Sequence, residues 1–121
     1  MQFSEDQNRT AVRINAWDSG HITINGQEHH RDMLLSVERI EDFEVPAFED
    51  LCTETIKRIC QLSPEVLLLG TGKEQRFPDM SIRNAALSEG LSLEVMDTMA
   101  ACRTFSLLNS EGRRVFALLY M

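Results

Sequence analysis

The sequence lacks the patterns that would assign it to several functional classes. Its 121 residues contain three cysteines and three histidines, and neither a Cys-x-x-Cys nor a His-x-x-x-His spacing occurs, so a metal site is not predicted. The adjacent His29 and His30 would point to opposite faces of a strand. No apolar run approaches the roughly 20 residues that cross a membrane. We therefore expect no metal, no other cofactor and no membrane span.

Basic residues are also scarce. The chain has 12 Lys and Arg against 19 Asp and Glu, a net charge of −7. An acidic domain repels phosphate backbones, so nucleic acid is not an expected partner. Residues 1–8 lack the basic start and apolar segment of a secretion signal, and they are not Arg-rich like a transit peptide. Because three widely spaced cysteines fit a reducing compartment, we expect a cytoplasmic protein.

The length and composition indicate one folded domain. Apolar residues make up 43% and charged residues 26% of the chain, close to ordinary globular usage. We interpret the polar residues 1–10 as a flexible arm and residues 11–121 as a single domain. Apolar and polar residues alternate between Ala11 and Val45, and Asn25-Gly26 is a strong hairpin signal. We expect a small antiparallel meander there, with residues 34–37 as a further strand.

The rest of the chain alternates between helix and strand patterns. Apolar spacing predicts a helix over residues 48–62, between Pro46 and Pro64. Strands are then expected at residues 66–69, 91–96 and 115–120, with helices between them. The last strand is apolar on both faces, which indicates a central position in a sheet. The fold class is therefore α/β, a three-layer single domain with a β-rich N-terminal meander and a mixed central sheet.

Two of these strands end in small polar residues, which predicts where a site would lie. Gly70-Thr71-Gly72 follows the strand at 66–69, and Asp97-Thr98 follows the strand at 91–96. Open α/β sheets bind ligands at the carboxyl ends of their strands. The candidate ligand-binding residues are Gly70, Thr71, Gly72, Arg76, Asp97, Thr98, Cys102, Arg103 and Thr104. No complete catalytic set is recognised among them.

Each candidate residue has a structural interpretation beside the functional one. Gly70-Thr71-Gly72 is a tight turn that could also cradle an anion. Arg76 and Arg103 could clamp a carboxylate or phosphate, or Arg103 could pair with an acid and fix a loop. Asp97 and Thr98 suit a helix cap or a polar ligand.

Cysteine and methionine side chains also leave alternatives open. Cys102 is a packed apolar residue or a functional thiol near a helix start. Met80, Met96 and Met99 either fill the core or form a soft patch for a partner.

Several motifs together resemble one known family. They are the segments 64–72 with 75–78, 93–98 with 100–105, and 111–115. The family comprises small bacterial and archaeal proteins of unknown function and includes the mitochondrial assembly factor three of respiratory complex I (NADH:ubiquinone reductase). The resemblance implies a three-layer α/β fold with a mixed central sheet and one antiparallel strand. We expect the C-terminal strand to be central and antiparallel to its neighbours. The resemblance implies no established enzyme activity.

The resemblance favours a non-enzymatic adaptor or assembly protein that binds a protein partner. The chain departs from the family at Phe105-Ser106, where Tyr-Asn is more common. We also expect no mitochondrial targeting extension, so a mitochondrial role is not carried over. The alternative is an anionic-ligand-binding protein, or an enzyme, that uses the crevice at Gly70–Gly72 and Asp97–Arg103. Small α/β domains often form two-fold dimers, so a homodimer is also considered.

Overall fold

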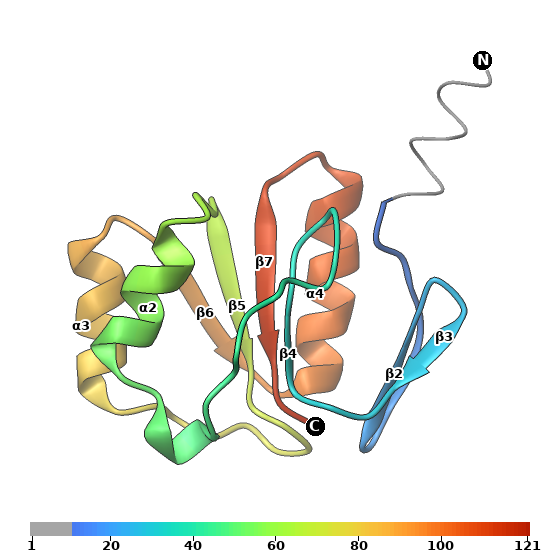
Figure 1. The fold of residues 1–121 in the computed structure, drawn as a ribbon, viewed down its shortest axis with the longest axis horizontal. Helices are drawn as coiled ribbons and strands as arrows, with labels where there is room; N and C mark the ends of the chain where they lie inside the picture. Colours follow the sequence, from blue (N-terminus) through green and yellow to red (C-terminus); the bar gives the residue numbers. More distant parts are fainter. Residues whose placement is uncertain (1–10) are drawn as a thin grey trace.

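Seven strands form two sheets in the computed structural model, which describes residues 11–121 (Figure 1). The arm expected at residues 1–10 lies outside the described residues. The small sheet is antiparallel and has the order β1 (Ile14–Asp18), β2 (His21–Ile24), β3 (Gln27–His29). The large sheet has the order β4 (Met33–Leu35), β7 (Val115–Leu119), β5 (Val66–Gly70), β6 (Ser92–Met96).

The two faces of the large sheet are covered by different elements. On one face lie α2 (Thr53–Cys60) and α3 (Met80–Ser88), and on the other α4 (Thr98–Ser110), with the small sheet beside it (Figure 1). Along β7, Val115, Ala117 and Leu119 belong to the apolar cluster under α4. Phe116 and Leu118 belong to the cluster under α2 and α3. This alternation confirms the three-layer α/β architecture and the central position of the last strand.

The direction of β7 corrects one detail of the sequence expectation. It runs antiparallel to β4, with Leu34 opposite Leu118, as expected. Against β5 it runs parallel, with Leu67 opposite Phe116, so the antiparallel relation holds for one neighbour and not for both. The chain passes from β5 to β7 through α3, β6 and α4. Helical crossovers return a strand in the direction of its predecessor, which explains the parallel pairing.

The N-terminal third contains a hairpin and a strand with a different destination. Asn25 and Gly26 have φ angles of 50° and 82°, and they connect β2 to β3 as the sequence predicts. By contrast, β4 is not part of the antiparallel N-terminal sheet, where the sequence analysis expected it. It pairs instead with β7 in the large sheet. All three residues of β4 are buried, so this strand needs cover on both faces.

The helix expected at residues 48–62 is interrupted. A 3₁₀ turn, η1 (Phe48–Asp50), is followed by Cys52 in an extended conformation, and α2 begins only at Thr53. Phe48 packs edge-on against Tyr120, while the buried residues of α2 face the sheet. The interruption places Phe48, which is half-buried, against Tyr120, while Ile56 and Ile59 of α2 are buried.

The predicted helix ends in the second half are confirmed. Asp79 accepts a hydrogen bond from the Ser81 N–H at the start of α3, and Gly90 follows that helix with a φ of 73°. Asp97 caps α4 by accepting from the Ala100 N–H at 2.8 Å. None of the helices within residues 11–121 is long and apolar enough to cross a membrane.

Candidate functional site

The carboxyl ends of β5 and β6 lie side by side, as the sequence predicts. Gly70 is paired with Met96 in the parallel register. Beyond the strands, the Thr71 N–H donates to the Met96 carbonyl, and the Thr98 N–H donates to the Gly72 carbonyl, both at 2.9 Å. The two polar segments therefore share one edge of the sheet.

The Thr98 hydroxyl joins three segments at this edge. It accepts a hydrogen bond from the Gly72 N–H at 2.8 Å and donates one to the Tyr120 carbonyl at 2.6 Å. Thr98 is buried, so these bonds form away from bulk water. The N–H groups of Thr71 and Gly72 are thus both engaged within the chain and do not point outward to cradle an anion.

Gly70 is required here by close packing. A Cβ atom at this position would lie 3.0 Å from Thr98 Oγ1, 3.0 Å from Leu119 Cδ2 and 3.1 Å from Ala101 Cβ. The next glycine, Gly72, has a φ of 101°, which other residues adopt only with strain. Both glycines therefore serve the tight turn, in agreement with the structural interpretation of this motif.

Thr71 and Arg76 shape the loop after β5. The Thr71 hydroxyl donates to the Glu74 carbonyl at 2.7 Å and accepts from the Arg76 N–H at 2.9 Å. The Arg76 Nε–H donates to the Thr71 carbonyl, and its guanidinium lies over the Phe48 ring, 4.0 Å from the centroid. Arg76 also forms an ion pair with Glu49 at 3.7 Å, which contributes little to stability because both side chains are exposed. Arg76 thus connects this loop to η1.

The two arginines expected to act as a clamp belong to different layers. Arg76 contacts Phe48, which packs on the cluster under α2 and α3. Arg103 is an exposed residue of α4, which covers the other face of the sheet. The structure therefore brings Gly70, Gly72, Thr98 and Asp97 together but separates the arginines by the sheet.

Cys102 and Thr104 both make internal contacts from α4. Cys102 is fully buried, and burial raises the pKa of its thiol to about 12, although the nearby Arg103 charge acts in the opposite direction. The thiol is therefore protonated at neutral pH. Thr104 donates its hydroxyl proton to the Ala100 carbonyl at 2.9 Å, one turn earlier in the helix.

An open groove lies beside Gly72, on the outer side of the loop. Its volume is about 360 Å³, and its lining includes Lys73 and Arg76 as the cationic side chains. Thr71, Gly72, Glu74 and Met121 complete the lining. Three of the nine predicted site residues line the groove. The other six do not: Gly70, Asp97, Thr98, Cys102, Arg103 and Thr104.

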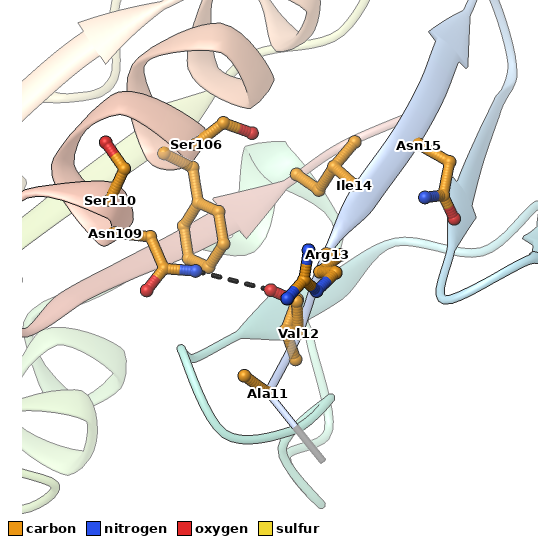
Figure 2. A pocket seen from close by; sticks show the side chains of 9 residues that line it. Ala11, Val12, Arg13, Ile14, Asn15, Ser106, Asn109 and Ser110 are labelled. Carbon is orange, nitrogen blue, oxygen red and sulfur yellow. Dashed lines mark hydrogen bonds between the residues drawn. The ribbon is translucent and has the colours of Figure 1, made fainter. Parts of the chain in front are cut away.

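A second groove was not indicated by the sequence. It has a volume of about 480 Å³ and separates the start of β1 from α4 (Figure 2). Asn109 of α4 faces Val12 across it and donates its side-chain N–H to the Val12 carbonyl at 3.3 Å. These residues are 97 positions apart, so no local pattern could have paired them.

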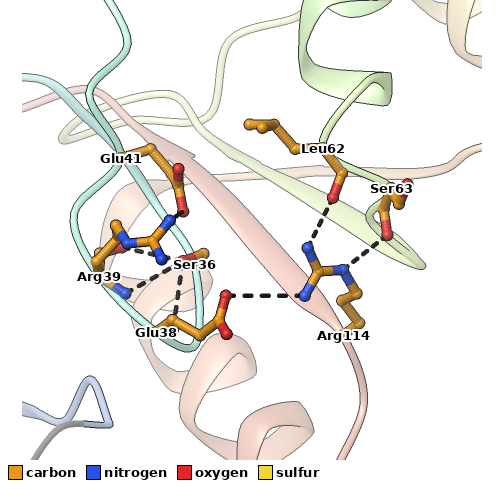
Figure 3. A network of polar contacts seen from close by, with 7 residues as sticks. All are labelled: Ser36, Glu38, Arg39, Glu41, Leu62, Ser63 and Arg114. Atoms are coloured by element: carbon orange, nitrogen blue, oxygen red, sulfur yellow. Dashed lines mark hydrogen bonds and ion pairs between the residues drawn. The ribbon is translucent and has the colours of Figure 1, made fainter.

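Arg114 forms a polar network that the sequence analysis also missed. Its Nε–H donates to the Ser63 carbonyl at 2.9 Å, and its Nη2 donates to the Leu62 carbonyl at 2.7 Å (Figure 3). The Glu38 carboxylate lies 4.0 Å from Nη1. Arg114 therefore fixes the chain just after α2. In the sequence, Arg114 was marked out only as part of the segment 111–115, which contributes to the family resemblance.

Cation-binding side chains are not clustered in the described part of the chain. Within residues 11–121, no group of three or more His, Cys, Asp or Glu side chains is placed to hold a metal ion.

The polar atoms around Thr98 form an internal junction of three chain segments. We call it the Thr98 junction, and it consists of Gly72, Thr98 and Tyr120.

Comparison with known proteins extends these observations. A family described as a protein of unknown function (DUF498/DUF598) matches residues 14–120. The "13 kDa major membrane protein" of Francisella tularensis is 26% identical over 117 residues, covering 95% of both chains. The NADH dehydrogenase [ubiquinone] 1 alpha subcomplex assembly factor 3 of the rat is 30% identical over 85% of this chain. The chain spans 57% of the length of that relative.

Among solved structures, the NMR structure of a Xanthomonas campestris protein has the same fold. Its TM-score is 0.80 at 36% sequence identity, and the match covers 89% of this chain and 83% of the other.

Proposed function

Because this chain belongs to the DUF498/DUF598 family of proteins of unknown function, we propose that it is a non-enzymatic adaptor that assists assembly of a multi-subunit complex. The observation that carries this proposal is the 30% identity to a complex I assembly factor over 85% of the chain. A protein of this kind acts through contacts with other proteins. Such a protein needs a stable fold with a surface that a partner can bind.

The geometry at the strand ends supports the same proposal. The Thr71 and Gly72 N–H groups and the Thr98 hydroxyl are all hydrogen-bonded within the chain. Cys102 is buried and protonated at neutral pH because burial raises its pKa. These groups hold the core together, which leaves the outer surface of the domain to bind a partner.

The test is genetic, in a host that carries both this gene and respiratory complex I. Deletion is expected to reduce the amount of assembled complex on a native gel and to leave unassembled subunits. Complementation with the wild-type chain restores it, whereas a chain with the destabilising Thr98→Val substitution restores less. Unchanged assembly after deletion would contradict a role in complex I and leave assembly of another complex to be examined by the same method.

The groove beside Gly72 supports a second candidate function, binding of a small anion. Lys73 and Arg76 both line it, and their positive charges suit a phosphate or carboxylate. Titration of ¹⁵N-labelled protein with inorganic phosphate is expected to shift the amide signals of Lys73 and Arg76. The shifts should disappear in Lys73→Gln and persist in the control Lys57→Gln, which changes a lysine on α2. Equal shifts in both variants would reject a site in this groove.

A further inference from the structure

The outward face of α3 and the residues just before it expose three large apolar side chains. Met80 and Leu87 are 68% and 79% exposed, and Phe77, just before the helix, is 72% exposed. At 100° per residue, Met80, Arg83, Asn84 and Leu87 share one face of α3. The buried residues Ile82, Ala85 and Ala86 occupy the opposite face. The exposed apolar residues are therefore not needed for the core of this domain.

This face has the composition of a protein interface. Arg83 is the only charged residue between Met80 and Ser88, in a chain of which 26% is charged. Among residues 11–121, no acidic side chain forms an ion pair with Arg83. Interface centres are depleted in charge but enriched in aromatic residues, Met and Arg. Phe77, Met80 and Arg83 fit that pattern.

We propose that α3 docks antiparallel against α3 of a second copy of this chain, across a two-fold axis. Met80 and Leu87 lie at equal distances on either side of the point between Arg83 and Asn84. A two-fold axis at that point places Met80 of each copy on Leu87 of the other. It also places Arg83 opposite Asn84 of the second copy, whose side-chain oxygen accepts a hydrogen bond from a guanidinium. The face is therefore complementary to itself, which a two-fold interface requires.

Two other exposed surfaces are not complementary to themselves across a two-fold axis. On α4, the exposed Met99 and Leu107 are centred on Arg103, so a two-fold axis would oppose two arginines. On the open edge of β6, antiparallel self-pairing centred on Glu94 would oppose two carboxylates. The carbonyl of Val95 on that edge already accepts a hydrogen bond from the Gln75 side chain at 3.2 Å. Of these three surfaces, only the face of α3 meets the requirement.

The available area predicts a weak dimer. Phe77, Met80 and Leu87 together expose on the order of 400 Å² in each copy, given side chains of about 150–200 Å². A pair of faces would then bury roughly 800 Å², below the ~1,200 Å² of stable specific interfaces. We therefore expect association at high protein concentration and monomers at low concentration.

Sedimentation equilibrium from low micromolar to millimolar protein tests this inference. The wild-type chain should approach twice the monomer mass as its concentration rises. The double variant Met80→Glu, Leu87→Glu should remain monomeric, because it buries four carboxylates in the proposed interface. The matched control Met99→Glu, Leu107→Glu on α4 makes the same chemical change and should dimerise like the wild type. Circular dichroism confirms that both variants are folded.

Two substitutions at the proposed axis test the register. Asn84→Glu places a carboxylate opposite Arg83 of the second copy and should lower the dimer dissociation constant several-fold. Asn84→Arg opposes two guanidinium groups and should raise it by a similar factor. A wild-type chain that stays monomeric at millimolar concentration overturns the proposal. So does a dimer that survives the double variant on α3 or responds equally to both Asn84 variants. None of these outcomes bears on the assembly role, which rests on a different observation.

Discussion

The Thr98 hydroxyl donates a hydrogen bond to the Tyr120 carbonyl oxygen at 2.6 Å, and the same hydroxyl accepts one from the Gly72 N–H. These partners lie 22 and 26 residues from Thr98 along the chain. One buried side chain therefore ties the ends of β5 and β7 to the start of α4. Where the sequence suggested a binding crevice, the structure has a junction whose polar groups are already paired.

Removal of the Thr98 hydroxyl should destabilise the domain. Thr98→Val keeps the shape of the side chain but leaves the Gly72 N–H and the Tyr120 carbonyl without their partner. Each unpaired buried group costs about 1–3 kcal/mol, so we expect a loss of roughly 2 kcal/mol or more in urea unfolding. Thr98→Ser keeps the hydroxyl and should lose less. Equal midpoints for Thr98→Val and the wild type would show that the junction contributes nothing to stability.

Gly70→Ala should also destabilise the protein, for a steric reason. The added Cβ would lie 3.0 Å from Thr98 Oγ1, inside normal contact distance, and the surrounding side chains are packed. Overpacking of this kind costs about 1–3 kcal/mol. The control is Gly20→Ala, where no atom lies within 4 Å and only the positive φ is strained. Thermal unfolding should rank Gly70→Ala below the control, and the reverse order would contradict the packing argument.

Local signals in the sequence predicted much of the fold. The Asn25-Gly26 turn and the Asp79 and Asp97 caps depend on residues within a few positions of each other, and all three are confirmed. The helix expected from Phe48 was interrupted because Phe48 packs against Tyr120, a contact that no local pattern specifies. Likewise, the parallel pairing of β7 with β5 depends on the route of the whole chain.

The sequence correctly predicted that two strand ends lie side by side, but not the contacts of the side chains there, and ligand binding by these residues stays a prediction. The strand ends at Gly70 and Met96 are adjacent because buried parallel strands end at a common edge. The sequence could not show that the Thr98 hydroxyl would donate a hydrogen bond to the Tyr120 carbonyl. That contact depends on the pairing of β7 with β5, which are far apart in the chain. Nor could it show that Arg76 would stack on Phe48 rather than face Arg103.

The three cysteines should react with alkylating reagents in a fixed order. Cys52 is exposed, and hydrogen bonding from the Thr55 side chain and backbone lowers the pKa of its thiol. Partial burial raises the pKa of Cys60, and burial raises the pKa of Cys102 to about 12. Mass spectrometry after timed iodoacetamide treatment should therefore find Cys52 modified first and Cys102 only after unfolding. The control variant Thr55→Val should slow the reaction of Cys52 alone. Modification of Cys102 at the rate of Cys52 in folded protein would contradict its burial.

Glu65 should make stability depend on pH in the acidic range. Its carboxylate accepts a hydrogen bond from the Arg114 backbone N–H and pairs with Arg113, and these contacts lower its pKa below the ordinary value of 4.5. Because the folded-state pKa is the lower one, the stabilisation is complete above pH 4.5. It is lost as the pH falls through the folded-state pKa. Glu65→Gln should therefore unfold at lower urea concentration than the wild type at pH 7.

That difference should shrink as the pH is lowered, because protonation removes from the wild-type chain the same charge that the substitution removes. The control is Glu94→Gln on the open edge of β6, whose carboxylate forms no ion pair within residues 11–121. Its unfolding midpoint should follow that of the wild type at every pH. A Glu65→Gln effect that is the same at pH 7 and at acidic pH would assign its cause to lost packing rather than to the charge at the start of β5.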